Sequence, residues 1–305
     1  MRVEYIRNGS TLKKKVNTTK KELLFERIGS YIVLTLLALL IIIPFYILIV
    51  SSFKTKGFMG FLSDSNPFVN MNWNGYITAL TGNIGTFADG TSKLLVGLRN
   101  TLIIVLPSTI VGLFVSALSA YATCKIRFKG RNVIFYTLLI TTMVPGIVMM
   151  TPLVTIFSNL NLYNTYFPLM VPGMFGAAMC VFFLRQTFMA IPDDYIDAAR
   201  LDGIGHFQIF WRIVVPLSAP SLIAQGILGF VAGYNDFLGP LLYLRGDGQW
   251  TVTLQTVLNE FLGQTSSNLY QALMAATVLT LVPTVIIFIV CQKFFVKGIV
   301  NSGIK

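Results

Sequence analysis

Apolar residues gather in six long blocks along the chain, and shorter stretches rich in polar residues separate these blocks. The blocks cover residues 29–50, 101–123, 133–157, 167–189, 216–244 and 270–295. A transmembrane helix needs about 20 mainly apolar residues, and every block reaches that length. The pattern therefore predicts an all-α, polytopic membrane protein with six transmembrane helices.

The composition of the 305 residues agrees with a membrane protein and argues against a soluble one. Hydrophobic residues make up 54% of the chain and charged residues only 11%, whereas a soluble globular domain has about 25% charged residues. His206 is the single histidine, which argues against a multi-histidine metal site, and the three cysteines indicate no disulfide framework. We therefore expect this chain to bind no metal and no cofactor of its own.

The distribution of lysine and arginine predicts how the chain is oriented. An even number of spans places both termini on one side of the membrane. If that side is the cytoplasm, 18 of the 23 basic residues lie in cytoplasmic segments, as the positive-inside rule requires. We divide the chain into a basic cytoplasmic segment, residues 1–28, and a transmembrane domain, residues 29–305. The net charge of +11 then reflects orientation and contact with anionic lipid, not nucleic-acid binding.

The polar segment between the fourth and fifth blocks has the pattern of two short helices joined by a turn. Pro192 stands at a first-turn position, followed by two aspartates that favour the positive end of a helix. Gly203 and Gly205 allow a tight turn. Apolar residues then return at helical spacing: Phe207, Phe210, Trp211 and Val214. The residues alone leave two interpretations open, a docking element for another protein or a connector between two spans.

Asp236 is the single acidic residue inside an apolar block. A charge at the centre of a transmembrane helix costs about 2.5–3.5 kcal/mol, so this carboxylate should face protein or water. Gly239 and Pro240 follow it and favour a break in the fifth helix. We hypothesise that Tyr234, Asn235 and Asp236 border a solute path, with the tyrosine ring stacked on a sugar and the polar groups bonded to hydroxyls. Packing against a partner subunit is the equally weighted alternative.

Several motifs resemble those of a known protein family. The spacing of Asp197-Ala198-Ala199, Gly203, Ile213 and Pro216 resembles the EAA loop of the membrane subunits of bacterial ABC importers. Asp197 departs from the glutamate that the family usually has, which keeps the charge but shortens its reach. Other segments are similar to the shorter, six-span subunit of the maltose-permease type: Asn100-Thr101, residues 141–146, 162–166, 234–242 and 294–298.

This resemblance implies a type I ABC importer permease fold with a coupling loop at about 190–216. It implies that the loop contacts an ATPase through these residues: Asp197, Ala198, Ala199, Asp202, Gly203, Phe207, Phe210, Ile213 and Pro216. It also implies an ATPase contact of the C-terminal tail, at Lys297 and Gly298. The implied partners are a homologous permease subunit, two ATPase subunits, an extracytoplasmic sugar-binding protein and membrane lipid, in the bacterial cytoplasmic (inner) membrane.

The expected function is uptake of a sugar, favouring an oligosaccharide, driven by ATP hydrolysis in the partner subunits. The chain has no Gly-x-x-x-x-Gly-Lys-Ser/Thr loop, so ATP and Mg²⁺ should bind the separate ATPase, and this subunit should be non-catalytic. A non-sugar solute such as a peptide or polyamine is the alternative within this architecture. An ion-coupled secondary transporter and a membrane-embedded enzyme are disfavoured, because no repeat and no group of intramembrane acids is evident.

Overall fold

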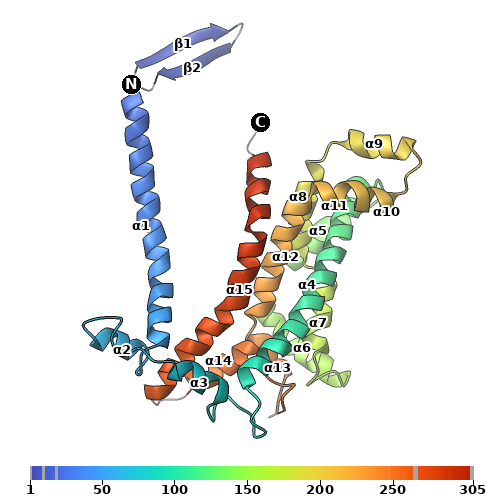
Figure 1. The fold of residues 1–305 in the computed structure, drawn as a ribbon. Helices are drawn as coiled ribbons and strands as arrows, with labels where there is room; N and C mark the ends of the chain where they lie inside the picture. Colours follow the sequence, from blue (N-terminus) through green and yellow to red (C-terminus); the bar gives the residue numbers. More distant parts are fainter. Residues whose placement is uncertain (1, 9–10, 18–19, 247, 264–266, 303–305) are drawn as a thin grey trace.

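The computed structural model describes residues 2–8, 11–17, 20–246, 248–263 and 267–302 of the chain, and side chains within 27–292. The chain is mainly helical, as predicted (Figure 1). An antiparallel hairpin of β1 (Arg2–Asn8) and β2 (Thr11–Asn17) precedes the helices and was not predicted. Helix α1 (Lys20–Ser52) begins ahead of the expected boundary at residue 28, so the end of the basic segment is helical.

The six apolar blocks correspond to four spans and two bent helix pairs. The spans are α1, α4 (Lys93–Lys125), α7 with α8 (Phe167–Met174 and Ala178–Met189) and α15 (Ser267–Ser302). The first bent pair is α5 (Arg131–Thr141) with α6 (Gly146–Asn159), which meet at 94°. The second comprises residues 206–217 and α12 (Ala219–Tyr234), which meet at 83°. The third block is therefore not the straight span that the hydropathy pattern predicts. The second bend lies near the start of the fifth block, which consists mainly of α12 and α13 (Leu238–Tyr243).

The bends have local causes. Pro145, the N-cap of α6, lacks an N–H and has an extended backbone, so the helical hydrogen bonding of α5 cannot continue through it. Ahead of it, the hydroxyls of Thr141 and Thr142 donate to the carbonyls of Leu138 and Leu139, both at 2.6 Å. At the second bend, Ser218 ends the first helix, and Pro220 stands at the start of α12. A helical hydrophobic pattern carries no information about either angle.

Helix α4 lies at the centre of the bundle and joins its two buried clusters. It packs against α7, α8, α12 and α14 (Leu254–Leu262). The α9-side cluster contains Ala117, Ala120, Tyr121, Val181, Leu184, Phe188, Ile191, Ile196, Ala199, Ile209, Phe210 and Val214. The α14-side cluster gathers residues of α4, α12, α14, α15 and the short α3 (Asn74–Thr81) around Leu254, Val257 and Phe261. Burial of these apolar side chains holds the spans together at both ends.

The two ends of the bundle differ in what they carry. Figure 1 shows the start of α1, the end of α15 and α9 (Asp193–Leu201) at one end, and the short helices α2 (Phe58–Ser63), α3, α13 (Leu238–Tyr243) and α14 at the other. The start of α1 and the end of α15 therefore lie at the same end of the bundle. The assignment of that end to the cytoplasm remains a prediction from the basic residues. The first part of helix α1 stands apart from the bundle, and residues 27–46 are all exposed, whereas the end of α1 contacts α2 and α15.

Candidate functional site

Residues 190–216 form the helix-turn-helix unit that the sequence predicts. Pro192 is the N-cap of α9, and Asp193 and Asp194 occupy its first turn, where the helix dipole favours negative charge. The helix ends at Leu201, and Gly203 takes a left-handed conformation with φ of +75°. Its N–H donates to the carbonyl of Arg200 at 3.0 Å, which closes the turn.

The second helix of the unit is continuous from His206 to Leu217. It consists of α10 (His206–Ile209), a π-helical turn (Phe210–Val214) and α11 (Val215–Leu217). The side chains on its inner face belong to the α9-side cluster, where the ring of Phe210 packs 5.4 Å from that of Tyr121. The unit is thus fixed to the end of α4 and α8 by its buried face, and its other face is free to contact a partner.

The structure divides the predicted coupling residues into supporting and exposed ones. Ala199 and Phe210 are buried, at 5% and 1% exposure, so they support the unit from within and are not available for contact. Ile213 is half-buried. The remaining predicted residues are exposed: Asp197, Ala198, Asp202, Gly203, Phe207 and Pro216. Leu201, which was not predicted, is 91% exposed beside the turn, an unusual position for a large apolar side chain.

One ion pair fixes α9 relative to the end of α4, and a second lies within α9. Lys125, whose side chain is 6% exposed, donates from Nζ to Asp193 Oδ1 at 2.6 Å and to the carbonyl of Ile191 at 2.7 Å. The hydrogen bond from Lys125 and its charge lower the pKa of the Asp193 carboxyl. Asp197 pairs with Arg200 at 3.3 Å within α9. Asp197 therefore lies on the helix face that carries Asp193 and Arg200, whereas Ala198 and Asp202 lie on the opposite face.

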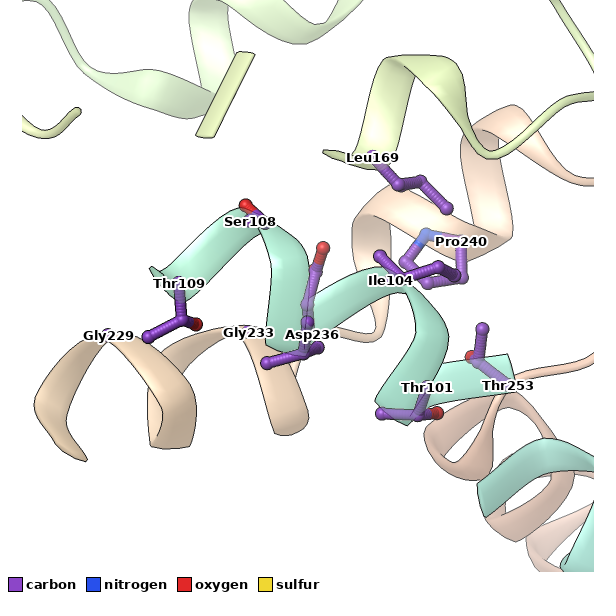
Figure 2. A pocket seen from close by; sticks show the side chains of 11 residues that line it. Thr101, Ile104, Ser108, Thr109, Leu169, Gly229, Gly233, Asp236, Pro240 and Thr253 are labelled. Atoms are coloured by element: carbon purple, nitrogen blue, oxygen red, sulfur yellow. The ribbon is translucent and has the colours of Figure 1, made fainter. Parts of the chain in front are cut away.

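A cavity of about 70 Å³ lies between α4 and the end of α12 (Figure 2). A second cavity, of about 330 Å³, adjoins it and shares Ser108, Thr109 and Gly229. The α4 residues that line the pair fall at helical spacing: Thr101, Ile104, Val105, Ser108, Thr109, Gly112, Leu113 and Ser116. Glycines of α12 face them and allow the open space. The two cavities follow α4 along much of its length.

The cavities carry polar groups that the protein itself leaves unbonded. The side chains of Ser108, Thr109 and Gln225 line them and make no hydrogen bond to any residue that the structure describes. Asp236 adds a carboxylate, and its Oδ1 accepts from the N–H of Gly239 at 3.1 Å. No basic residue is among those that line the two cavities. Such groups are suited to bind the hydroxyls of a polar solute.

The predicted break in the fifth apolar block is present. Helix α12 ends at Tyr234, and helical structure resumes only at Leu238, so Asn235 and Asp236 lie in the interruption. Asp236 is exposed to the cavity, as Figure 2 shows. Asn235 is exposed beside it, and its Oδ1 accepts from Gln255 Nε2 at 3.2 Å. The sequence thus identified the polar break.

The expected role of Tyr234 is wrong for this conformation of the protein. Its side chain is 1% exposed, and its ring stacks on Phe230 at 5.4 Å, so it does not face a cavity. Its hydroxyl donates to the carbonyl of Thr280 in α15 at 2.9 Å. Tyr234 therefore joins α12 to α15 by packing and one buried hydrogen bond.

Replacement of Tyr234 by phenylalanine tests this correction. The ring packing stays and the bond to the Thr280 carbonyl is lost, so the free energy of unfolding should fall by about 1 kcal/mol, with solute selectivity unchanged. Thermal unfolding and a competition uptake assay measure the two effects. Tyr46→Phe, at a side chain 39% exposed, is the control. An altered preference among solutes in Tyr234→Phe would return this residue to the solute path.

Two sets of residues remain: the predicted contact at the C-terminal end of α15, and a polar face of α4 that was not predicted. Lys297 and Gly298 lie near the end of α15, where the structure describes the backbone but not the side chains, so their role stays a prediction. The hydroxyl-bearing face of α4 and Gln225 in α12 were missed. The signal was available, because serine, threonine and glycine recur on one face of an otherwise apolar helix, as at Thr101, Ser108 and Gly112.

Comparisons with known proteins agree with this architecture. The model of a family described as binding-protein-dependent transport system inner membrane component matches residues 109–301. The arabinooligosaccharides transport system permease protein AraQ of Bacillus subtilis (strain 168) is 33% identical over 285 residues, which cover 92% of this chain and 96% of that protein. The sn-glycerol-3-phosphate transport system permease protein UgpE of Yersinia pestis (bv. Antiqua, strain Antiqua) is 35% identical over 205 residues, covering 67% of this chain and 72% of that protein.

A solved structure has the same fold. It belongs to a bacterial ABC transporter involved in the import of the acidic polysaccharide alginate. The two chains superpose with a TM-score of 0.73 at 20% sequence identity, over 92% of this chain and 100% of the other.

Proposed function

Because the chain belongs to the family of binding-protein-dependent transport system inner membrane components, we propose that it forms half of the solute path of an ABC importer for a sugar. The preferred solute is an oligosaccharide. The proposal is supported mainly by the unbonded hydroxyl and amide groups of Ser108, Thr109 and Gln225 on the cavities between α4 and α12. A sugar offers many hydroxyls that such groups can bind, and the shared cavities give it a route along α4.

The charge of the cavity favours a neutral sugar over an anionic solute. Asp236 is the acidic residue among those that line the two cavities, and no lysine or arginine accompanies it there. A phosphate or uronate group would meet the field of this carboxylate without a neighbouring cation, which disfavours its passage. One relative is named for arabinooligosaccharides, which are neutral, and another for glycerol 3-phosphate, which is an anion. The carboxylate of Asp236 favours a solute of the first kind in our proposal.

The helix-turn-helix unit is proposed to couple this path to ATP hydrolysis. Its exposed surface at Ala198, Asp202 and Leu201 would fit a cleft on an ATPase subunit, while its buried face transmits movement to α4 and α8. Closure of the ATPase dimer would move this unit and its counterpart together, and turn the bundles from inward-open to outward-open. In this scheme ATP and Mg²⁺ bind the ATPase, and this subunit is non-catalytic.

The proposed assembly contains this chain, a homologous permease subunit, two ATPase subunits and an extracytoplasmic sugar-binding protein. The exposed surface of α1 fits such an assembly. Its residues 27–46 are apolar over most of their length and are exposed, so lipid or the second permease would cover them.

The path is tested by removing single polar groups from the cavities. Thr109→Val and Gln225→Leu keep the approximate shape but remove one hydrogen-bonding group each, so each should lower sugar uptake about three- to tenfold, the effect of ~1 kcal/mol. Asp236→Asn should widen the range of solutes toward anions. ATP-driven uptake of labelled oligosaccharides, glycerol 3-phosphate and a peptide by the reconstituted complex measures this.

The control is Gln186→Leu, at an exposed position on α8 away from the cavities. It makes the same chemical change as Gln225→Leu and should leave uptake unaltered. Wild-type uptake by both cavity variants would refute the path, and uptake of a peptide but no sugar would favour the alternative solute.

A further inference from the structure

A polar cleft of about 140 Å³ lies between the end of α4, the start of α5 and α9. We call it the basic cleft. Its charged lining residues are Lys125, Arg127, Arg131, Asp193, Asp197 and Arg200. Four cations and two carboxylates leave an excess of positive charge in a volume large enough for several water molecules, which occupy about 30 Å³ each in the liquid.

The carboxylates of the basic cleft are already used by two of its cations. Lys125 pairs with Asp193 at 2.6 Å, and Arg200 pairs with Asp197 at 3.3 Å. Arg127 and Arg131 form no ion pair with any residue that the structure describes. The positive charge of these two guanidinium groups is therefore free to bind an anion from outside the chain.

A fifth cation adds to the positive field. The guanidinium of Arg185 in α8 lies over the ring of Phe135 at 4.0 Å. Its Nε is buried and has no hydrogen-bond partner among the described residues. The thiol of Cys124, which lines the basic cleft, lies within electrostatic range of Lys125, Arg131 and Arg185 and of one carboxylate, Asp193. The positive electrostatic potential of the cleft therefore extends toward α8 in the bundle.

The surroundings of the basic cleft indicate what kind of anion it receives. The cleft lies where α4 ends and α5 begins, which is the level at which apolar spans meet the lipid headgroups. Immediately beyond Arg131, α5 exposes Val133, Ile134 and Tyr136, at 68%, 50% and 60%. An occupant with a phosphate for the arginines and acyl chains for this apolar surface satisfies both features.

We propose that the basic cleft binds the headgroup of one anionic phospholipid, with its phosphate between Arg127 and Arg131 and its acyl chains along α5. The lipid ties the base of α9 to the membrane surface. The face of α9 that carries Ala198 and Asp202 points away from the cleft and stays free for a protein partner. The inference depends on membrane placement alone and holds whichever solute the protein carries.

Native mass spectrometry of the assembled complex from nanodiscs tests this proposal. Wild-type protein should retain phosphatidylglycerol and release phosphatidylcholine. The double variant Arg127→Gln/Arg131→Gln should retain roughly tenfold less phosphatidylglycerol, because each cation near an anionic headgroup contributes several-fold to binding. The control Lys129→Gln/Arg212→Gln removes two exposed cations outside the cleft and should retain lipid as the wild type does.

Three results would overturn the proposal. Equal retention of phosphatidylcholine by the wild-type complex, which needs no variant, would remove the requirement for an anion. Displacement of the lipid by excess inorganic phosphate would identify a free-phosphate site. Loss of the ATPase from the double variant, with phosphatidylglycerol retention unchanged, would assign the arginines to a protein partner.

Discussion

Replacement of Gly203 by valine is expected to reduce ATP-driven uptake at least tenfold while the protein stays in the membrane. Gly203 has φ of +75° in the turn between α9 and α10. The left-handed region costs a non-glycine residue about 1–2 kcal/mol, and more if it is β-branched. A Cβ at this position meets no atom within 4 Å, so the effect comes from the backbone and not from crowding. The strain is relieved by moving the exposed turn, which displaces the surface proposed to contact the ATPase.

Two controls separate this effect from a general disruption of the loop structure. Gly205→Val makes the same change two residues later, where φ is −71° and no atom lies within 4 Å, so uptake should be retained. Gly203→Asn should restore part of the activity, because asparagine tolerates the left-handed region. Uptake and ATP hydrolysis are measured in proteoliposomes. Normal uptake by Gly203→Val, or equal loss in Gly205→Val, would contradict the role given to the turn.

Replacement of Gly112 by alanine should destabilise the bundle by about 1–3 kcal/mol, the usual effect of overpacking. A Cβ on Gly112 of α4 would overlap the carbonyl oxygen of Gly173 in α7, which is backbone and cannot rotate away. The helices must therefore separate. Gly112 also lines the larger cavity, so uptake should fall together with stability.

Thermal unfolding of the purified protein in detergent measures the effect of Gly112→Ala. The control is Gly29→Ala in α1, where a Cβ meets no atom within 4 Å and the substitution should be neutral or slightly stabilising. An unfolding temperature of Gly112→Ala equal to that of the wild type would show that α4 and α7 do not make this close contact.

The features that the sequence predicted well are those governed by local backbone chemistry. Gly203 and the aspartates at the start of α9 specify a turn and a helix start, and both lie where expected. Pro240 and the polar pair Asn235 and Asp236 indicated the interruption after α12, because proline and polar groups disrupt an apolar helix wherever it packs. The number of membrane-crossing segments was predicted from the length of the apolar blocks alone.

The features that the sequence predicted poorly depend on tertiary geometry. Pro145 marks the position of a bend, but the angle of 94° depends on how α5 and α6 pack. Tyr234 has a polar group that could equally serve a solute or the Thr280 carbonyl, and only the position of α15 decides between them. The hairpin β1–β2 did carry a local signal, since the sequence Gly-Ser between the two strand segments is a dipeptide typical of hairpin turns.

Cross-linking from two exposed positions on the assembled complex tests the account most directly. A photoreactive residue replaces Leu201 beside the turn of the helix-turn-helix unit, or Leu62 in α2 at the opposite end, at side chains 91% and 64% exposed. Mass spectrometry should identify an ATPase subunit on position 201 and an extracytoplasmic sugar-binding protein on position 62. An ATPase on position 62, or a chain that purifies and cross-links only with copies of itself, would contradict the proposed coupling unit and the orientation together.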